Sequence, residues 1–251
     1  MRYWVWLTQL PYIGSVSANR LLDKFGIPEA IYNADREDLV KITGINNRQI
    51  KSILTNRKLD QADSILDNCE KCGIFILTKQ DKLYPDRVKK YRDAPPILYY
   101  KGKIRELKHT VGIVGARRCT QDTKQFVAEL TAKFVSDNHT IVSGMAKGVD
   151  SYAHTVCVNA GGYTIAILGN GLDLCYPSEH VKLMQAIEEK GLLLSEYPPG
   201  TRPTRYSFPM RNRLISAWSD ELVVVQAGKG SGALITADYT RKYNKSVCFY
   251  G

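Results

Sequence analysis

Long apolar segments are missing from this 251-residue sequence. No stretch approaches the roughly 20 apolar residues that a membrane-spanning helix needs. The start, MRYWVWLTQLPYIG, also lacks an apolar core followed by a small-residue cleavage site. With 44% hydrophobic and 24% charged residues, the composition is that of a globular protein. We therefore expect a cytoplasmic protein that makes no membrane contact.

Cysteine is sparse, with six residues scattered through apolar and loop segments. A chain of this size does not need disulfides to hold its core together, so we expect reduced thiols. Cys69 and Cys72 have the spacing of half a zinc site, but the sequence has no second such pair and no histidine pair nearby. The sequence therefore predicts no metal site.

Two nucleotide-binding motifs are incomplete. A dinucleotide site needs G-x-G-x-x-G after a first strand and an acidic residue after the second strand. Here the first loop is GIVGARR, from Gly112 to Arg118, and the second strand ends in Ser143 and Gly144. The segment AGKGSGA (227–233) has the letters of a P-loop without its spacing. These gaps disfavour NAD(P)-dependent enzymes and P-loop ATPases, and we predict no cofactor.

Basic residues are what the sequence has in excess. The formal net charge is +10, and residues 1–105 hold 19 Lys or Arg against 12 Asp or Glu. A basic protein of this kind favours an anionic partner such as nucleic acid, although basic surfaces also serve solubility.

The first 75 residues predict a helical domain. Apolar residues at three- and four-residue spacing predict helices over 15–25, 29–34, 36–42 and 46–55. Two turns, around Gly14 and Gly44, each place an apolar residue, a glycine and then a polar helix start, which resembles a helix-hairpin-helix or SAM-like unit. Such glycines either allow tight turns between helices or bring backbone amides close to a phosphate.

Residues 76–105 are interpreted as a linker with strand-like segments, and 106–251 as a Rossmann-like domain. Helical patterns over 122–137 and 178–190 alternate with apolar runs at 111–115, 140–144, 164–169, 192–196, 222–227 and 246–250. Short β-branched strands that alternate with helices predict an α/β fold with a doubly wound parallel sheet covered on both faces.

The loops after these strands carry the candidate site, because ligands bind outside the carboxyl ends of such strands. Nearly every loop offers glycine, and four of five offer Lys or Arg, which together would form an anion-binding rim. Residues that the loops contribute, besides those named below, are Arg118, Met145, Ala146, Tyr176, Lys182, Ser231 and Gly232.

Aromatic residues lie among arginines in this region. Tyr176, Tyr197, Tyr206 and Phe208 neighbour Arg202, Arg205, Arg211 and Arg213. Single-stranded nucleic acid is bound by such combinations, with stacking worth ~1–3 kcal/mol per base. The alternative is that the rings belong to the core and the arginines to helix surfaces.

The sequence offers few groups of residues that could form a catalytic site. Asp150 and His154 lie four residues apart on one helix, but no serine or cysteine nucleophile is predicted beside them, and such a pair more often secures a helix start. We therefore predict no catalytic residues and no enzyme activity.

Six segments in order resemble the DprA/Smf family, DNA processing protein A. They are IVGARR, IVSGMAKGVDSYAH, GGYTIAILGNGLDLCYPSEH, GLLLSEYPPGTRP, FPMRNRLISAWSDELVVVQA and SGALITA, and they cover about 110–240. LPYIG and YPDRVKKYRDAPPILYYKG resemble the family's N-terminal domain and linker.

The resemblance implies an extended Rossmann domain that binds and protects single-stranded DNA, forms a homodimer and loads the RecA recombinase in natural transformation. It places the phosphate-contacting arginine at Arg117. It also places the following residues in the same pocket or beside it: Ser143, Gly144, Lys147, Gly169, Asn170, Gly171, Phe208, Arg211, Asn212 and Arg213.

The sequence departs from the family in two places. Many relatives have a basic residue directly after the YP of the third loop, where this chain has Ser178 and Glu179. The chain stops at Gly251, where relatives usually continue, so functions of that tail are not carried over. GKGSGALITAD (228–238) also resembles LOG-type phosphoribohydrolases, which leaves a nucleotide-binding or nucleotide-hydrolysing pocket as the alternative function, and a pure scaffold as a third.

Overall fold

The computed structural model describes residues 1–250. The chain divides into two compact units, Met1–Leu98 and Tyr99–Gly251. The division falls inside strand β2 (Ile97–Gly102). None of the helices within 1–250 is both long enough and apolar enough to cross a bilayer.

The first unit is built mainly of short helices. Its elements, in chain order, are α1 (Arg2–Gln9), α2 (Ser15–Phe25), α3 (Pro28–Asn33), α4 (Arg36–Val40), α5 (Asn47–Thr55), α6 (Asp60–Lys71), β1 (Phe75–Thr78) and α7 (Asp86–Lys89). The four helices expected from the sequence correspond to α2 to α5. Helices α1 and α6 were not expected, although Ala62, Ile65 and Cys69 bury one face of α6.

Local sequence signals explain where these helices start. Asn46 and Gln49 form a reciprocal capping box at the start of α5, and Asp35 accepts a hydrogen bond from the backbone of Asp38 at the start of α4. Gln49 also donates to the backbone oxygen of Tyr12, at 3.0 Å. The turn between α1 and α2 is thereby tied to the turn between α4 and α5, as expected for paired hairpins.

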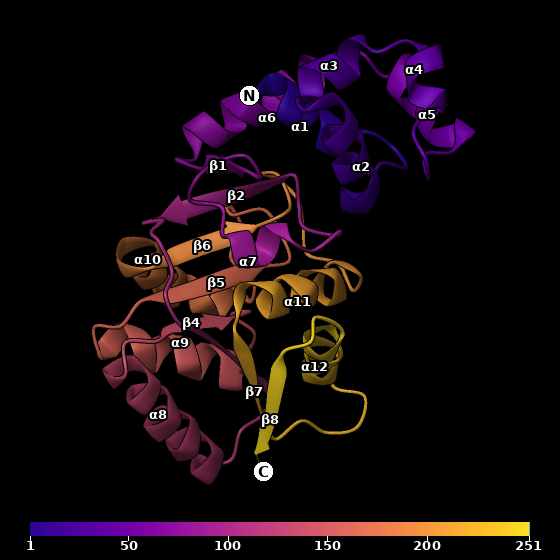
Figure 1. The fold of residues 1–251 in the computed structure, drawn as a ribbon. Helices are drawn as coiled ribbons and strands as arrows, with labels where there is room; N and C mark the ends of the chain where they lie inside the picture. The colour runs from indigo at the N-terminus through magenta and orange to yellow at the C-terminus, as the bar shows by residue number, and fades with distance from the viewer. Residues whose placement is uncertain (251) are drawn as a thin grey trace. The chain divides into compact units, whose positions relative to one another are not determined.

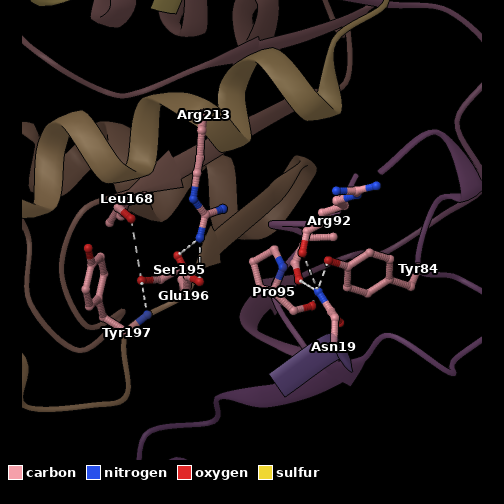
Figure 2. A network of polar contacts seen from close by, with 10 residues as sticks. Asn19, Tyr84, Arg92, Pro95, Leu168, Ser195, Glu196, Tyr197 and Arg213 are labelled. Atoms are coloured by element: carbon pink, nitrogen blue, oxygen red, sulfur yellow. Dashed lines mark hydrogen bonds and ion pairs between the residues drawn. The ribbon is translucent and has the colours of Figure 1, made fainter. Parts of the chain in front are cut away.

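The segment that follows α6 is fastened to α2 (Figure 2). The side-chain amide of Asn19 donates to the backbone oxygens of Arg92 and Ala94, at 3.0 and 2.8 Å, and Tyr84 donates to Pro95 at 2.9 Å. Asn19 and Tyr84 are both buried, so these bonds satisfy polar groups that would otherwise destabilise the interior.

The second unit alternates strands and helices. After β2 come β3 (Thr110–Gly115), α8 (Gln121–Ser136), β4 (Thr140–Ser143), α9 (Val149–Asn159), β5 (Thr164–Leu168), η1 (Ser178–His180), α10 (Val181–Lys190), β6 (Leu192–Ser195), α11 (Ser207–Trp218), β7 (Glu221–Val225), α12 (Gly232–Lys242) and β8 (Ser246–Tyr250). The strands β3 to β8 agree with the six apolar runs of the sequence.

The strands from β2 to β8 lie in the order β2-β6-β5-β4-β3-β7-β8. The pairs from β6 through to β8 are parallel, whereas β2 pairs with β6 in antiparallel orientation, with Tyr99 opposite Ser195. Helices α8, α9 and α10 cover one face, and α11 and α12 cover the other (Figure 1). The doubly wound α/β fold is confirmed, and β2, which lies in the region expected to contain strand-like segments, adds one antiparallel strand to it.

The core of this unit explains why these strands are so apolar. Ile113, Ile141 and Val223 from three neighbouring strands are almost fully buried and pack against Val127 of α8 and Ala153 of α9. Strands covered on both faces present no polar side, so apolar residues run along them without alternation.

The order of the strands reverses beside β3. The chain moves outward from β3 through β4 and β5 to β6, and then returns to place β7 on the other side of β3. The loops that leave β3 and β7 consequently diverge to opposite faces, which opens a crevice at the carboxyl ends of these strands.

Candidate functional site

A cavity of about 920 Å³ occupies this crevice. It is lined by the loops after β3, β4 and β7, by the loop that precedes α10 and by the start of α11. The predicted site residues among its lining are Arg117, Arg118, Gly144, Ala146, Lys147, Tyr176, Phe208, Arg211, Asn212, Ser231 and Gly232. The tertiary fold therefore brings eleven of the eighteen predicted residues, from five separate segments, to one cavity.

Arg117 and Arg118 follow β3 at the point where the strand order reverses. Both side chains are exposed, and neither guanidinium has an ion-pair or hydrogen-bond partner among residues 1–250. Gly148, with a φ of +81°, lies against this loop: a Cβ there would come within 2.7 Å of the carbonyl carbon of Arg117. Glycine thus allows the loops after β3 and β4 to approach each other.

Lys147, in the loop after β4, is a third cation of the rim. Its Nζ lies 2.7 Å from Oε2 of Glu179 in η1, and both side chains are more than half exposed. Close by, Nδ1 of His180 lies 3.1 Å from the backbone oxygen of Met145. Two contacts therefore join the loop after β4 to η1.

Two aromatic rings stack at the cavity. The centroids of Tyr176 and Phe208 lie 5.4 Å apart with an interplanar angle of 33°. Tyr176 is half exposed, and Phe208 at the start of α11 is partly buried. The pair lines the same cavity as Arg117 and Arg118.

Arg211 contributes a buried charge to the cavity wall. Its Nη1 donates to the backbone oxygen of Gly144 at 2.5 Å and to that of Ile167. Burial lowers the pKa of Arg211 to about 10, while the carboxylate of Asp150 acts in the opposite direction. Because that pKa is still well above neutral, Arg211 is cationic at pH 7.

Asp150 supplies the matching buried carboxylate. Its Oδ2 accepts the backbone N–H groups of Gly144 and Ala146, at 3.1 and 3.4 Å. Burial raises the pKa of Asp150, and Arg211 and these N–H donors oppose that rise. Asp150 thus secures the loop in front of α9.

His154 lies one turn further along α9 and is fully buried. Its Nδ1 lies 2.7 Å from Oγ1 of Thr164, whereas its Nε2 has no hydrogen-bond partner in the described part of the chain. Burial lowers the pKa of His154 to about 3, helped by the charges of Arg211 and His180. His154 is therefore neutral at physiological pH and does not line the cavity.

The other predicted residues lie outside this cavity. Ser143, Met145, Gly169, Asn170 and Gly171 are buried behind it, with the hydroxyl of Ser143 donating to Ile113 and the amide of Asn170 donating to Gly171 and Leu174. These residues support the loops and are not among those that line the cavity. Lys182 lines a second, smaller hollow of about 460 Å³ beside η1.

Arg213 is held inside the protein (Figure 2). Its Nη2 lies 2.6 Å from each carboxylate oxygen of Glu196, and only 4% of the Arg213 side chain is exposed. Next to this pair, Oγ of Ser195 accepts the backbone N–H of Tyr197 at 3.0 Å. These contacts fix the chain as it leaves β6.

Some lining residues carried no signal of their own in the sequence. Pro177, Pro203, Thr204, Gln226 and Thr236 line the cavity, and none of them belongs to a charge or glycine pattern. Arg205, also in the lining, was noted for its charge but not chosen as a site residue. Proximity to the strand ends could have selected Gln226, which directly follows β7.

Comparison with known families agrees with this architecture. The family model of DNA recombination-mediator protein A matches residues 75–251. The chain belongs to this family. A SAM-like helix-hairpin-helix tandem matches residues 7–56, which contain both hairpins. The resemblance to the DprA/Smf family is thereby confirmed.

Curated relatives cover much of the chain. A protein named Smf from Synechocystis is 36% identical over 250 residues, which make up 98% of this chain and 63% of that relative. DNA processing protein DprA from Bacillus subtilis is 36% identical over 209 residues, which make up 81% of this chain and 70% of the relative. The chain thus spans less than two thirds of the Synechocystis relative.

Solved structures of the family have the same fold. DNA processing protein A from Streptococcus pneumoniae matches with a TM-score of 0.84 and 27% identity, over 99% of this chain and 86% of that one. DNA processing protein A from Helicobacter pylori, whose structure was described for its single-stranded DNA binding mode, matches with a TM-score of 0.65 and 32% identity, over 70% and 80%.

Proposed function

We propose that this protein binds single-stranded DNA at the cavity beside β3, without enzymatic activity, and that it protects the strand and loads RecA onto it as a homodimer. The observation that carries the proposal is that one cavity combines cations that have no partner among residues 1–250 with an accessible ring: Arg117 and Arg118 share its lining with Tyr176 and Phe208. Cations that have no carboxylate partner are available for phosphates, and the ring face is available for a base.

A polymer fits this site better than a dinucleotide. In dinucleotide sites glycines bring the backbone to a pyrophosphate, and an acid after the second strand holds a ribose. Here arginines follow β3, and β4 ends at the buried Ser143, whose hydroxyl is bonded to Ile113. Cationic side chains that reach outward suit a chain of phosphates along the rim.

The relatives support the same ligand. The Helicobacter pylori protein was described for how it binds single-stranded DNA, and the family is described as a recombination mediator. We extend both statements to this chain, including delivery of the strand to a recombinase.

The second candidate, a pocket for a free nucleotide, is favoured by one observation: Oγ of Ser231, at the start of α12, is buried in the described structure without a hydrogen-bond partner. Hydrolysis is less well supported than binding. Glu196, directly after β6, is paired with Arg213, and Asp238 of α12 is paired with Arg241, so both of these acids are engaged. Neither acid lines the cavity.

The deciding experiment is a salt titration of binding to a labelled single-stranded oligonucleotide, with duplex of the same sequence for comparison. We expect Arg117→Ala to weaken single-strand binding equally for all sequences. Each lost phosphate contact removes ~0.7 from the slope of log K against log salt. Lys133→Ala is the matched control, because Lys133 is exposed near the end of α8, which leads to the start rather than the end of β4.

If the wild-type protein binds well and Arg117→Ala changes neither the affinity nor the slope of log K against log salt, the cavity is not the site where the strand binds. Release of base from nucleoside monophosphates would favour the nucleotide pocket instead. RecA loading is tested by measuring the rate of RecA ATP hydrolysis on single strands to which this protein has already bound. Sedimentation measures whether the protein forms a dimer at the concentrations used.

A further inference from the structure

Glu179 occupies an unusual place on the rim. It lines the smaller hollow together with Lys182, and its carboxylate reaches Lys147, which lines the larger cavity. Among the described residues that line either space, Asp150 and Glu179 are the acids, and Asp150 is buried. Glu179 is thus an exposed negative charge in contact with a cation of the larger, basic cavity.

The geometry of the contact favours Glu179 as the resting partner of Lys147. The Nζ to Oε2 distance of 2.7 Å is that of a charge-assisted hydrogen bond. The neighbouring contact between His180 and the backbone of Met145 holds η1 against the loop that carries Lys147. The hydrogen bond to Lys147 also lowers the pKa of Glu179, so the carboxylate is charged at neutral pH.

We propose that the carboxylate of Glu179 competes with the phosphates of a bound strand for Lys147: it holds Lys147 in an ion pair that must open before Lys147 can contact DNA. This inference rests on the proposed function, because it concerns the same site. In the free protein Arg117 and Arg118 are available at once, whereas Lys147 is available only when the pair breaks. The pair would therefore lower affinity and reduce the number of phosphates contacted.

The expected size of the effect is modest, because both side chains are exposed and solvent screens the pair. Removing the charge in Glu179→Gln is expected to tighten single-strand binding about two- to fivefold. It should also steepen the slope of log K against log salt by about 0.7, since one more cation becomes free to contact a phosphate.

The matched control is Glu189→Gln, which changes the net charge equally. Glu189 is exposed near the opposite end of α10, eight residues after the start of that helix. Binding is also measured for Lys147→Gln and for the double variant Lys147→Gln/Glu179→Gln. If Glu179 acts through Lys147, the gain from Glu179→Gln vanishes when Lys147 is already replaced.

Each outcome decides a different point. Tighter binding by Glu179→Gln, with and without Lys147, would mean that Glu179 repels the strand directly, and the proposed competition would be wrong. Binding no tighter than that of Glu189→Gln would equally overturn it, while the single-strand site at Arg117 would stand. Wild-type protein that binds no oligonucleotide at any salt would instead refute the proposed function. Unchanged melting temperatures establish that the exposed substitutions leave the fold intact.

Discussion

Asp150 and Arg211 are two buried charges that bind the same residue, Gly144. The carboxylate of Asp150 accepts the backbone N–H of Gly144, and the guanidinium of Arg211 donates to its backbone oxygen. The aspartate lies in the first turn of α9 and the arginine lies in α11, on the other face of the sheet. The end of β4 is therefore held between two charges that balance each other.

Removing the positive charge should destabilise the protein strongly. In Arg211→Met, Asp150 keeps its burial but loses the cation that favours its ionised form, and the oxygens of Gly144 and Ile167 lose a donor. We expect the free energy of unfolding to fall by about 3 kcal/mol, measured by urea denaturation. Arg205→Met is the control, because Arg205 is exposed, and it should change stability by less than about 0.5 kcal/mol. Equal losses in the two variants would contradict the buried-charge account.

Gly144 itself should tolerate no side chain. A Cβ at this position would lie 2.6 Å from Cζ of Arg211, whose guanidinium is held by the backbone oxygens of Gly144 and Ile167. We expect Gly144→Ala to reduce the free energy of unfolding by about 1–3 kcal/mol, the usual range for overpacking. Gly228→Ala provides the comparison, since a Cβ there meets nothing within 4 Å. A neutral Gly144→Ala would show that Arg211 is more mobile than its contacts indicate.

The buried His154 predicts how stability depends on pH. Its pKa is lowered to about 3 in the folded protein, from an ordinary 6.5. Between these values the unfolded chain binds a proton that the folded protein does not, so stability falls as pH falls. From about pH 7.5 to about pH 5, this group alone should cost about 2 kcal/mol.

The variant His154→Asn isolates this effect, because asparagine can still bond Thr164 but does not titrate. Wild type should lose about 2 kcal/mol more than the variant over this pH range, by urea denaturation. His109→Asn, at an exposed position, should follow wild type. Parallel pH profiles for His154→Asn and wild type would mean that His154 is protonated in the folded protein.

The ring pair predicts a contribution from bases rather than phosphates. Phe208→Ala should weaken single-strand binding by about 1–3 kcal/mol if a base stacks on this pair. The salt dependence should stay the same, because no cation is lost. An abasic oligonucleotide should bind wild type and Phe208→Ala alike, and a persisting difference would assign Phe208 a structural role only.

The course of α11 was not predictable from its pattern. A typical surface helix shows an apolar stripe, but in α11 the polar Arg211, Asn212 and Arg213 are buried together with their apolar neighbours. Because no polar face is left to show the helical period, the sequence did not predict a helix over 207–218. Its arginines were open to interpretation as surface charges, whereas the structure buries both.

The sequence by itself determined the class of fold and where in that fold a ligand is expected to bind. Six apolar, β-branched runs alternating with helices allow little other than a doubly wound sheet, and such a sheet binds ligands at the carboxyl ends of its strands. The loop GIVGARR was therefore a candidate as soon as it followed a buried strand.

Only the tertiary structure decided which of the basic residues are available. The basic residues are chemically alike in sequence, but Arg211 and Arg213 are covered by the protein, and Lys147 is paired with Glu179. Arg117 and Arg118 remain exposed, without an ion-pair or hydrogen-bond partner among residues 1–250. A charge is free or engaged according to the burial and the counter-charge that distant segments supply, and neither can be read from its neighbours in the chain.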